Sequence, residues 1–154
     1  MPAEVREQYV NDVYNLVVGE PATVKKGDLL KNAVDAIVNK PLSENVYVID
    51  KNGRLLGVIS MGGLLKQVGY RIGARKAGVV SFIHLMSDLM KDEVEQFMEK
   101  TAAAKKEMLL KDALKLMVEK RMNNLPVVDD KGVLIGELNG LEILIAARKL
   151  FDEK

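Results

Sequence analysis

The chain has 154 residues, enough for one ordinary domain or two very small ones. Hydrophobic residues make up 48% and charged residues 29%, a composition typical of a globular protein rather than a disordered or collagenous one. The 23 Lys and Arg against 22 Asp and Glu leave a net charge of +1, which argues against a dedicated nucleic-acid-binding protein. The lack of Cys excludes disulfides and thiolate sites, and the single histidine, His84, excludes a multi-histidine metal site.

No stretch of the chain predicts a membrane segment. The opening residues, Pro2–Asp12, are charged and polar, unlike a secretion signal. The longest uncharged apolar run, Ala77–Met86, is too short to cross a bilayer. We therefore expect a cytoplasmic protein without membrane association.

The first half of the chain alternates helical and extended patterns. A short extended stretch at Ala22–Lys25 precedes a helix, because apolar residues recur at helical spacing from Leu29 to Val38. Two β-branched runs then predict a hairpin, and Asn52-Gly53 between them is a strong tight-turn signal. The predicted strands are Val46–Ile49 and Leu55–Ile59, and a helix follows at Gly62–Val68.

A connecting region follows, and the same order of elements then returns. The connection carries a basic stretch, Arg71–Lys76, and a helical stripe of apolar residues from Val79 to Met90 that predicts core or a subunit interface. The second half again predicts an extended stretch, a helix, a hairpin and a final helix. These lie at Ala103–Lys106, Leu110–Val118, Leu125–Val128 with Leu134–Leu138, and Gly140–Phe151.

The two halves are an internal repeat. Asn45–Leu65 aligns with Asn124–Leu144 at an offset of 79, with seven of 21 positions identical, and Leu30–Lys40 aligns with Leu110–Lys120 at an offset of 80, with five of 11 identical. The single-residue shift falls in a loop, where such changes are tolerated. We predict an α/β (α+β) fold of two β-α-β-β-α repeats packed sheet to sheet with pseudo-two-fold symmetry. The expected bounds are 1–70, a linker at 71–93, and 94–154.

The second repeat resembles the CBS domain. The residues that carry this resemblance are Val94-x-x-Phe97-Met98, the Leu110–Lys120 helix, Asn124–Asp129 and Gly132-x-Leu134-Ile135-Gly136. Two such domains in tandem resemble a Bateman module. The first repeat departs from the pattern, because Tyr47 stands where the second has Pro126.

The resemblance implies a regulatory sensor rather than an enzyme. Such modules hold AMP, ADP, ATP, S-adenosylmethionine or NAD in clefts between the two repeats, and we expect a homodimer that signals to a partner protein. No metal is expected. No catalytic set and no phosphate-cradling P-loop is present.

In that family a Ser or Thr followed three residues later by Asp opens the last helix, and the Asp meets the ribose hydroxyls. A carboxylate suits this role because its two oxygens both accept hydrogen bonds. This chain departs from the marker in both repeats. Ser60 is followed by Gly63, which has no carboxylate, and Asn139 is followed by Glu142, so the second repeat is the favoured site. The alternative for Asn139 and Glu142 is a capping box, and for Ser60 a helix N-cap.

Further ligand contacts follow from the resemblance. Adenine contacts are expected from Thr101, Ala102, Asn124, Leu125 and Pro126 in the second repeat, and from Thr23, Asn45, Val46 and Tyr47 in the first. Hairpin packing is the alternative for each. Phosphate candidates are Arg71, Arg75, Lys76, Lys120 and Arg121, which could equally be solvated surface.

Two other functions stay open. A ligand-free dimerisation or interaction module would explain the altered marker residues. A divalent-cation sensor could use the acidic cluster Asp92, Glu93 and Glu95, since carboxylates suit hard cations.

Overall fold

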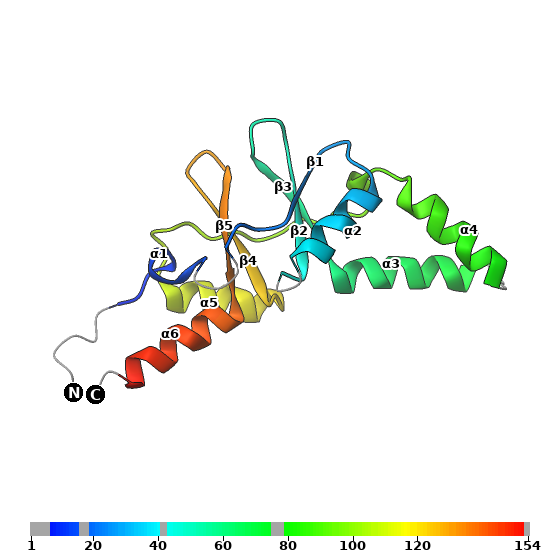
Figure 1. The fold of residues 1–154 in the computed structure, drawn as a ribbon. Helices are drawn as coiled ribbons and strands as arrows, with labels where there is room; N and C mark the ends of the chain where they lie inside the picture. The colour runs from blue at the N-terminus through cyan, green and yellow to red at the C-terminus, as the bar shows by residue number, and fades with distance from the viewer. Residues whose placement is uncertain (1–6, 16–18, 41–42, 75–78, 153–154) are drawn as a thin grey trace. The chain divides into compact units, whose positions relative to one another are not determined.

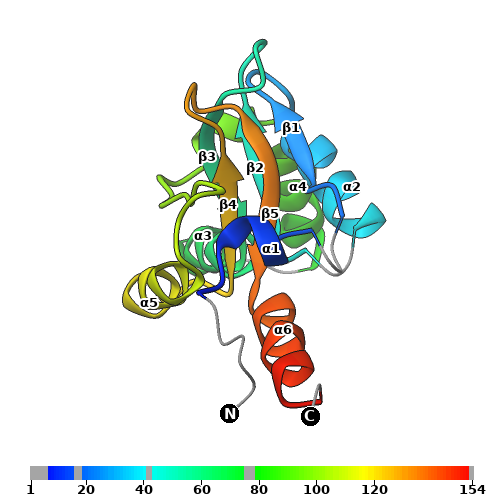
Figure 2. The same cartoon turned by 90° about the vertical axis from the view of Figure 1, so that its left-hand side faces the viewer.

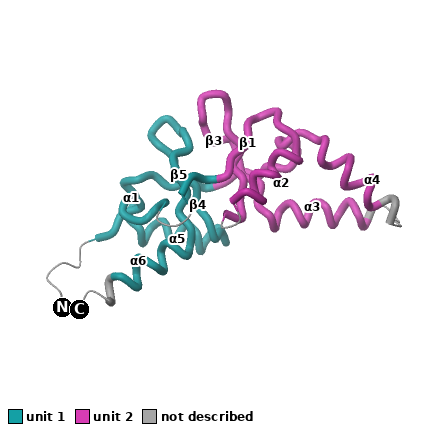
Figure 3. The backbone as a smooth tube through the Cα atoms, viewed as in Figure 1, with its two compact units in different colours: residues 1–21, 102–154 teal, residues 22–101 magenta. Residues whose placement is uncertain are grey.

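The computed structural model describes residues 7–15, 19–40, 43–74 and 79–152. The chain forms two compact units (Figure 3). One unit comprises residues 22–101, and the other comprises residues 1–21 together with 102–154. The chain therefore leaves the second unit after its N-terminal segment and returns to it at residue 102.

The unit of residues 22–101 combines a three-stranded sheet with helices (Figure 1). Its elements, in chain order, are β1 (Thr23–Lys25), α2 (Leu30–Asn39), β2 (Asn45–Ile49), β3 (Leu55–Ser60), α3 (Met61–Ala74), α4 (Val79–Met90) and the short 3-10 helix η1 (Val94–Gln96). The strand order is β1-β2-β3, with β1 parallel and β3 antiparallel to β2. The last predicted helix is confirmed and is longer than expected, since α3 continues past Val68 to Ala74.

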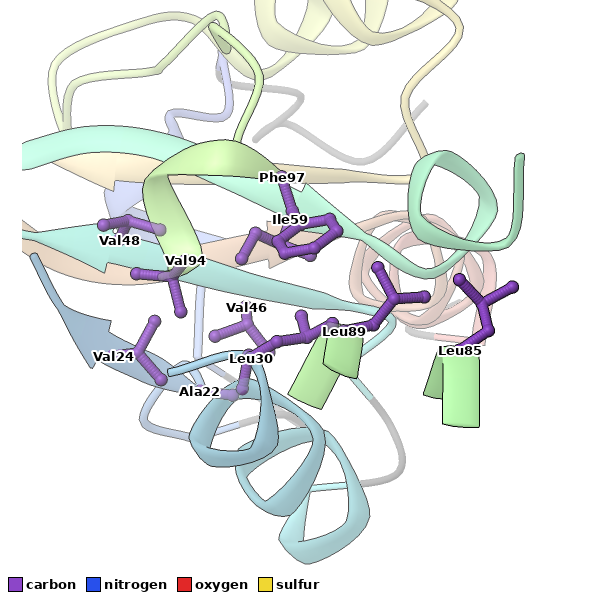
Figure 4. Packing of buried hydrophobic residues seen from close by; sticks show 11 residues of the cluster. Ala22, Val24, Leu30, Val46, Val48, Ile59, Leu85, Leu89, Val94 and Phe97 are labelled. Carbon is purple, nitrogen blue, oxygen red and sulfur yellow. The ribbon is translucent and has the colours of Figure 1, made fainter. Parts of the chain in front are cut away.

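The core of this unit is built by apolar side chains from the three strands and from the helices packed against them. Figure 4 shows Leu30 of α2, Val46 of β2 and Leu89 of α4 in one buried cluster. The predicted apolar stripe on α4 is thus confirmed as core at Leu85 and Leu89, while other positions of that helix are exposed. Burying such a side chain contributes about 1.5–3 kcal/mol, so this cluster is a main source of stability.

The unit of residues 1–21 and 102–154 has a two-stranded sheet. Its elements are α1 (Val10–Val13), α5 (Leu110–Lys120), β4 (Asn124–Val128), β5 (Leu134–Asn139) and α6 (Gly140–Asp152). Strands β4 and β5 are antiparallel, and α1 lies beside β5 (Figure 2). The core collects buried apolar residues from all of these elements: Val10, Val13, Ala104, Ala113, Met117, Leu125, Val127, Leu138 and Ile143.

The extended stretch predicted at 103–106 is reduced to one parallel bridge, Ala104 to Val127. The corresponding stretch of the first repeat is strand β1, so that prediction is confirmed there. The difference has a cause in the backbone. In the first repeat the N–H of Tyr47 donates to the carbonyl oxygen of Ala22 at 2.9 Å, whereas Pro126 at the matching position has no N–H to donate.

Both hairpins close on the same turn. The Asp50 carboxylate accepts the N–H groups of Asn52 and Arg54, and the Asp129 carboxylate accepts those of Lys131 and Val133. The glycine that follows has a left-handed backbone in each, with φ 81° at Gly53 and 82° at Gly132. The repeat read in the sequence is therefore also a repeat of turn geometry.

Each unit includes a short segment that stands, in the sequence, just before the other repeat. Residues 8–15 come before the first repeat and join the second, and residues 92–99 come before the second repeat and join the first. We call residues 8–15 and 92–99 the leading segments. The N–H of Val10 donates to the carbonyl of Met108 at 2.9 Å, and the N–H of Leu110 donates to that of Gln8 at 2.7 Å. The other unit has the same pair, Val94 to Asp28 and Leu30 to Asp92, both at 2.8 Å.

The compact units therefore differ from the bounds expected from the sequence. The hydrogen bonds of the N-terminal segment and its buried Val10 and Val13 lie with the second repeat, whereas the bounds 1–70, 71–93 and 94–154 for the repeats and linker stay a prediction. The α+β class and the tandem β-α-β-β-α repeats are confirmed, the first strand of the second repeat being a bridge. Among the described residues, no helix has the length and hydropathy needed to cross a membrane.

Candidate functional site

In the unit of residues 22–101, the predicted ligand residues of the first repeat meet at one end of the sheet. Asn45 begins β2 and pairs with Ser60 at the end of β3, while Thr23 of β1 pairs with Tyr47. Asn45, Val46 and Tyr47 are buried, and Tyr47 is among the largest fully buried side chains. The burial of these three side chains fits the alternative of hairpin packing, and their contact with adenine stays a prediction, as does that of the exposed Thr23.

The start of α3 carries the N-cap predicted for Ser60. Its Oγ accepts the N–H of Gly63 at 3.0 Å, which satisfies one of the unpaired donors of the first turn. A Cβ atom added at Gly63 would lie 2.8 Å from Oγ of Ser60 and 3.5 Å from Oε1 of Glu99. A carboxylate therefore stands beside residue 63, although it is carried by a distant part of the chain.

The start of α6 carries the capping box predicted as the alternative for the second repeat. The N–H of Asn139 donates to Oε1 of Glu142 at 2.9 Å, and the N–H of Glu142 donates to Oδ1 of Asn139 at 3.0 Å. Both side chains are buried, and Glu142 is fully so. The structure shows the capping role of this pair, and the ribose contact stays a prediction.

The other predicted adenine contacts of the second repeat lie close to this cap. Asn124 begins β4 and pairs with Asn139, and Leu125 and Pro126 follow it along the strand. All three are buried. Thr101 and Ala102 fall on either side of the boundary between the compact units, and both are half-buried.

The predicted phosphate contacts have different surroundings. Arg71 pairs with Asp92 at 3.4 Å, and its guanidinium lies 5.2 Å from the centre of the Phe97 ring. Lys120 and Arg121 are exposed at the end of α5, where Arg121 has a left-handed backbone with φ 54°. Arg75 and Lys76 lie outside the described residues.

The acidic cluster is divided between different partners. Asp92 pairs with Arg71, and the Glu95 carboxylate accepts the N–H of Gly27 at 2.6 Å. In the ranges that the structure describes, no three Asp, Glu or His side chains are grouped as a metal ion would require. The described geometry gives the divalent-cation reading no support.

Glu99 was not among the residues predicted from the sequence. It stands 36 residues after Gly63, and no spacing rule connects the two positions. The sequence does contain a signal for its segment. Val10-x-x-Val13-Tyr14-Asn15 resembles Val94-x-x-Phe97-Met98-Glu99, so Glu99 and Asn15 occupy equivalent positions of the two leading segments.

Comparison with known proteins identifies the family. The CBS domain model matches residues 10–70 and 86–148. The uncharacterized protein MJ1426 of Methanocaldococcus jannaschii is 33% identical over 107 residues. That match covers 58% of this chain and 64% of the relative, so it spans less than two thirds of the relative's length.

Solved structures agree with this match over nearly the whole chain. A CBS domain-containing protein of Thermotoga maritima, TM0935, is 30% identical and has a TM-score of 0.75, covering 94% of this chain and 96% of its own. CBSX2 of Arabidopsis thaliana, in complex with AMP, is 26% identical with a TM-score of 0.69, covering 93% and 98%. With a repeat, a fold and a sequence match in both halves, the chain belongs to the CBS domain family and carries two such domains in tandem.

Proposed function

We propose that this chain is a regulatory module that binds an adenosine-containing ligand and signals to a partner protein through a homodimer. The observation that carries the proposal is the similarity, over almost the full length of both chains, to CBSX2 in complex with AMP. AMP, ADP, ATP, S-adenosylmethionine and NAD share the adenosine group, so all are candidate ligands. Tandem CBS domains generally regulate rather than catalyse, which suits a chain with no recognisable catalytic set.

The ends of the two hairpins support a nucleoside ligand. In each repeat a strand ends directly at a helix N-terminus, at Ser60 before α3 and at Asn139 before α6. Helix N-termini favour negatively charged groups nearby, and polar side chains at a strand end can orient a flat base. These features match the chemistry of an adenosine phosphate.

The first test is thermal unfolding with each of the five ligands, with GMP as the control for the base. At a hundredfold excess over Kd one ligand adds about 2.7 kcal/mol, which raises the midpoint by about 5–10 °C for a chain of this size. Glu142→Gln should weaken binding at the second repeat, because an amide can keep the cap while the charge is lost. No shift with any adenosine ligand would overturn the sensor proposal.

One observation favours a ligand-free interaction module instead. Asn139 and Glu142 satisfy each other in the cap, and Gly63 offers no side chain, so neither marker needs a ligand to explain its conformation. This module would give no ligand-dependent shift and would still self-associate.

The homodimer remains part of the proposal. Leu65 of α3 and Leu144 of α6 occupy aligned positions of the repeat and are 65% and 68% exposed. A second copy of this chain could cover both apolar faces. Light scattering should give a mass of two chains for the wild type, and the double substitution Leu65→Ser with Leu144→Ser should reduce it to the mass of a single chain.

A further inference from the structure

The carboxylate of Glu99 stands where the first repeat lacks an acidic side chain. A Cβ atom at Gly63 would lie 3.5 Å from Oε1 of Glu99 and 3.7 Å from its carboxyl carbon. The same Cβ would lie 2.8 Å from Oγ of Ser60. Ser60, Gly63 and Glu99 all belong to the unit of residues 22–101, so this arrangement is internal to one compact unit.

The backbone of Glu99 is held firmly against β3. Its N–H donates to the carbonyl of Val58 at 2.8 Å, and its carbonyl accepts the N–H of Val58 at 2.9 Å. Gly57 makes this approach possible, because a Cβ there would lie 2.8 Å from the carbonyl oxygen of Glu99. The position from which the carboxylate reaches residue 63 is therefore set by the fold.

The carboxylate itself is available. Glu99 is exposed, and within the described part of the chain its carboxylate makes no hydrogen bond or ion pair. The N–H of Gly63 is already satisfied by Ser60, so Glu99 is not needed to cap α3. A solvated carboxylate beside a capped helix start can accept hydrogen bonds from a ligand.

In the second repeat the amide side chain lies on the leading segment and the carboxylate lies on the helix. Asn15 occupies the position of Glu99, and its Oδ1 accepts the N–H of Glu137 at 3.2 Å. The acid lies instead on α6, as Glu142, where it is buried in the cap. The carboxylate compared here therefore lies on the helix in one unit, as Glu142, and on the leading segment in the other, as Glu99.

We infer that Glu99 supplies, in place of residue 63, the carboxylate that accepts hydrogen bonds from the vicinal hydroxyls of a nucleoside ribose at the start of α3. This inference rests on the proposed function and names the residue that selects the sugar in the first repeat. Its chemical basis is the two acceptor oxygens of a carboxylate, which match two adjacent hydroxyl donors in charge-assisted hydrogen bonds. A sugar without those hydroxyls would leave the carboxylate without these partners.

The test compares AMP with 2′,3′-dideoxy-AMP on the full chain by titration calorimetry. Glu99→Gln should weaken AMP binding by about 10- to 100-fold at one site, the range for a hydrogen bond to a charged group. It should leave the already weak dideoxy-AMP binding unchanged. Glu93→Gln is the matched control, because it removes the same charge from an exposed position of the same leading segment, and AMP affinity should not change.

The outcomes separate the inference from the proposed function. If wild type binds AMP and Glu99→Gln binds it with the same affinity, the role of Glu99 is overturned and the sensor proposal stands. An equal loss for AMP and dideoxy-AMP also overturns it, since that would be a general effect of charge. A wild-type chain that binds no adenosine ligand overturns both. The thermal midpoint of unliganded Glu99→Gln should equal that of wild type, which separates loss of binding from loss of fold.

Discussion

The ring of Tyr14 lies directly on Gly136. A Cβ atom added at Gly136 would be 2.5 Å from two carbons of that ring and 2.8 Å from Oδ1 of Asn15. Gly136 is in β5 and Tyr14 follows α1, so a residue near the start of the chain packs on a strand near its end. Only glycine allows this contact, because any side chain would occupy the space of the ring.

Gly136→Ala should destabilise the chain by about 1–3 kcal/mol, the usual cost of overpacking, as measured by urea unfolding. Gly69→Ala is the control. Gly69 is exposed within α3 with nothing near its Cβ position, so alanine there should stabilise by about 0.5–1 kcal/mol. Adding Tyr14→Ala should relieve part of the Gly136→Ala cost, and strictly additive effects would contradict the contact.

Val10→Ala should cost about 2 kcal/mol, because Val10 is fully buried among apolar residues of the second repeat. Val38→Ala is the matched control, since Val38 is 70% exposed and its loss should change stability by less than about 0.5 kcal/mol. Hydrogen exchange should show a protected Val10 amide, which donates to Met108. Equal effects of the two substitutions would mean that the leading segment does not pack as described.

Asn139→Ala should cost about 1 kcal/mol, the usual value of an N-cap, and Glu142→Ala at least as much because it also empties a buried site. The two losses should not add, since each residue satisfies the backbone of the other. Glu142→Gln should retain most of the stability because an amide oxygen can also accept the Asn139 N–H. Additive losses in denaturant unfolding would argue against a reciprocal cap.

The Asp50 carboxylate should make the free energy of unfolding depend on pH. The N–H of Arg54, more than that of Asn52, holds the pKa of the Asp50 carboxyl below its usual range, by donating to the charged form. A lowered folded pKa gives a contribution that is complete above the ordinary Asp pKa of about 3.9 and is lost as pH falls through the folded value.

The urea midpoint of Asp50→Asn should therefore lie below that of wild type at pH 7, and the difference should shrink below about pH 3.9. Asp35→Asn, at an exposed position of α2, controls for the loss of one negative charge. A difference that is constant from pH 7 to pH 2.5 would contradict the role of the Asp50 carboxylate.

The local elements were predictable because their signals are local. Helix α5 repeats the apolar spacing of α2, and each hairpin is marked by an Asp three residues before a glycine, the residue that can take the left-handed turn. The caps at Ser60 and Asn139 follow from residue type and position alone. The reduced strand at Ala104 was missed, although the missing N–H of Pro126 was visible in the sequence.

The relation of Glu99 to Gly63 was not predictable in this way. Neither residue type nor spacing brings a carboxylate from residue 99 to a helix that starts at residue 61. It arrives there because Gly57 admits the backbone of Glu99 to the edge of β3. Such a contact depends on two segments meeting in space, and it appears only when the fold is known.

The sequence by itself determined the family, the two repeats and the elements within each, because periodicity, turn residues and caps act over a few neighbouring positions. Only the tertiary structure decided which repeat each leading segment completes. Residues 8–15 could meet either Asp28–Leu30 or Met108–Leu110, since both offer the same backbone groups before a helix. The structure pairs them with the second, and pairs residues 92–99 with the first. Backbone hydrogen bonds are the same whatever the side chains, so they cannot decide which repeat a leading segment joins. That pairing depends on long-range packing, at residues such as Gly136 and Gly57 that leave space for one particular neighbour.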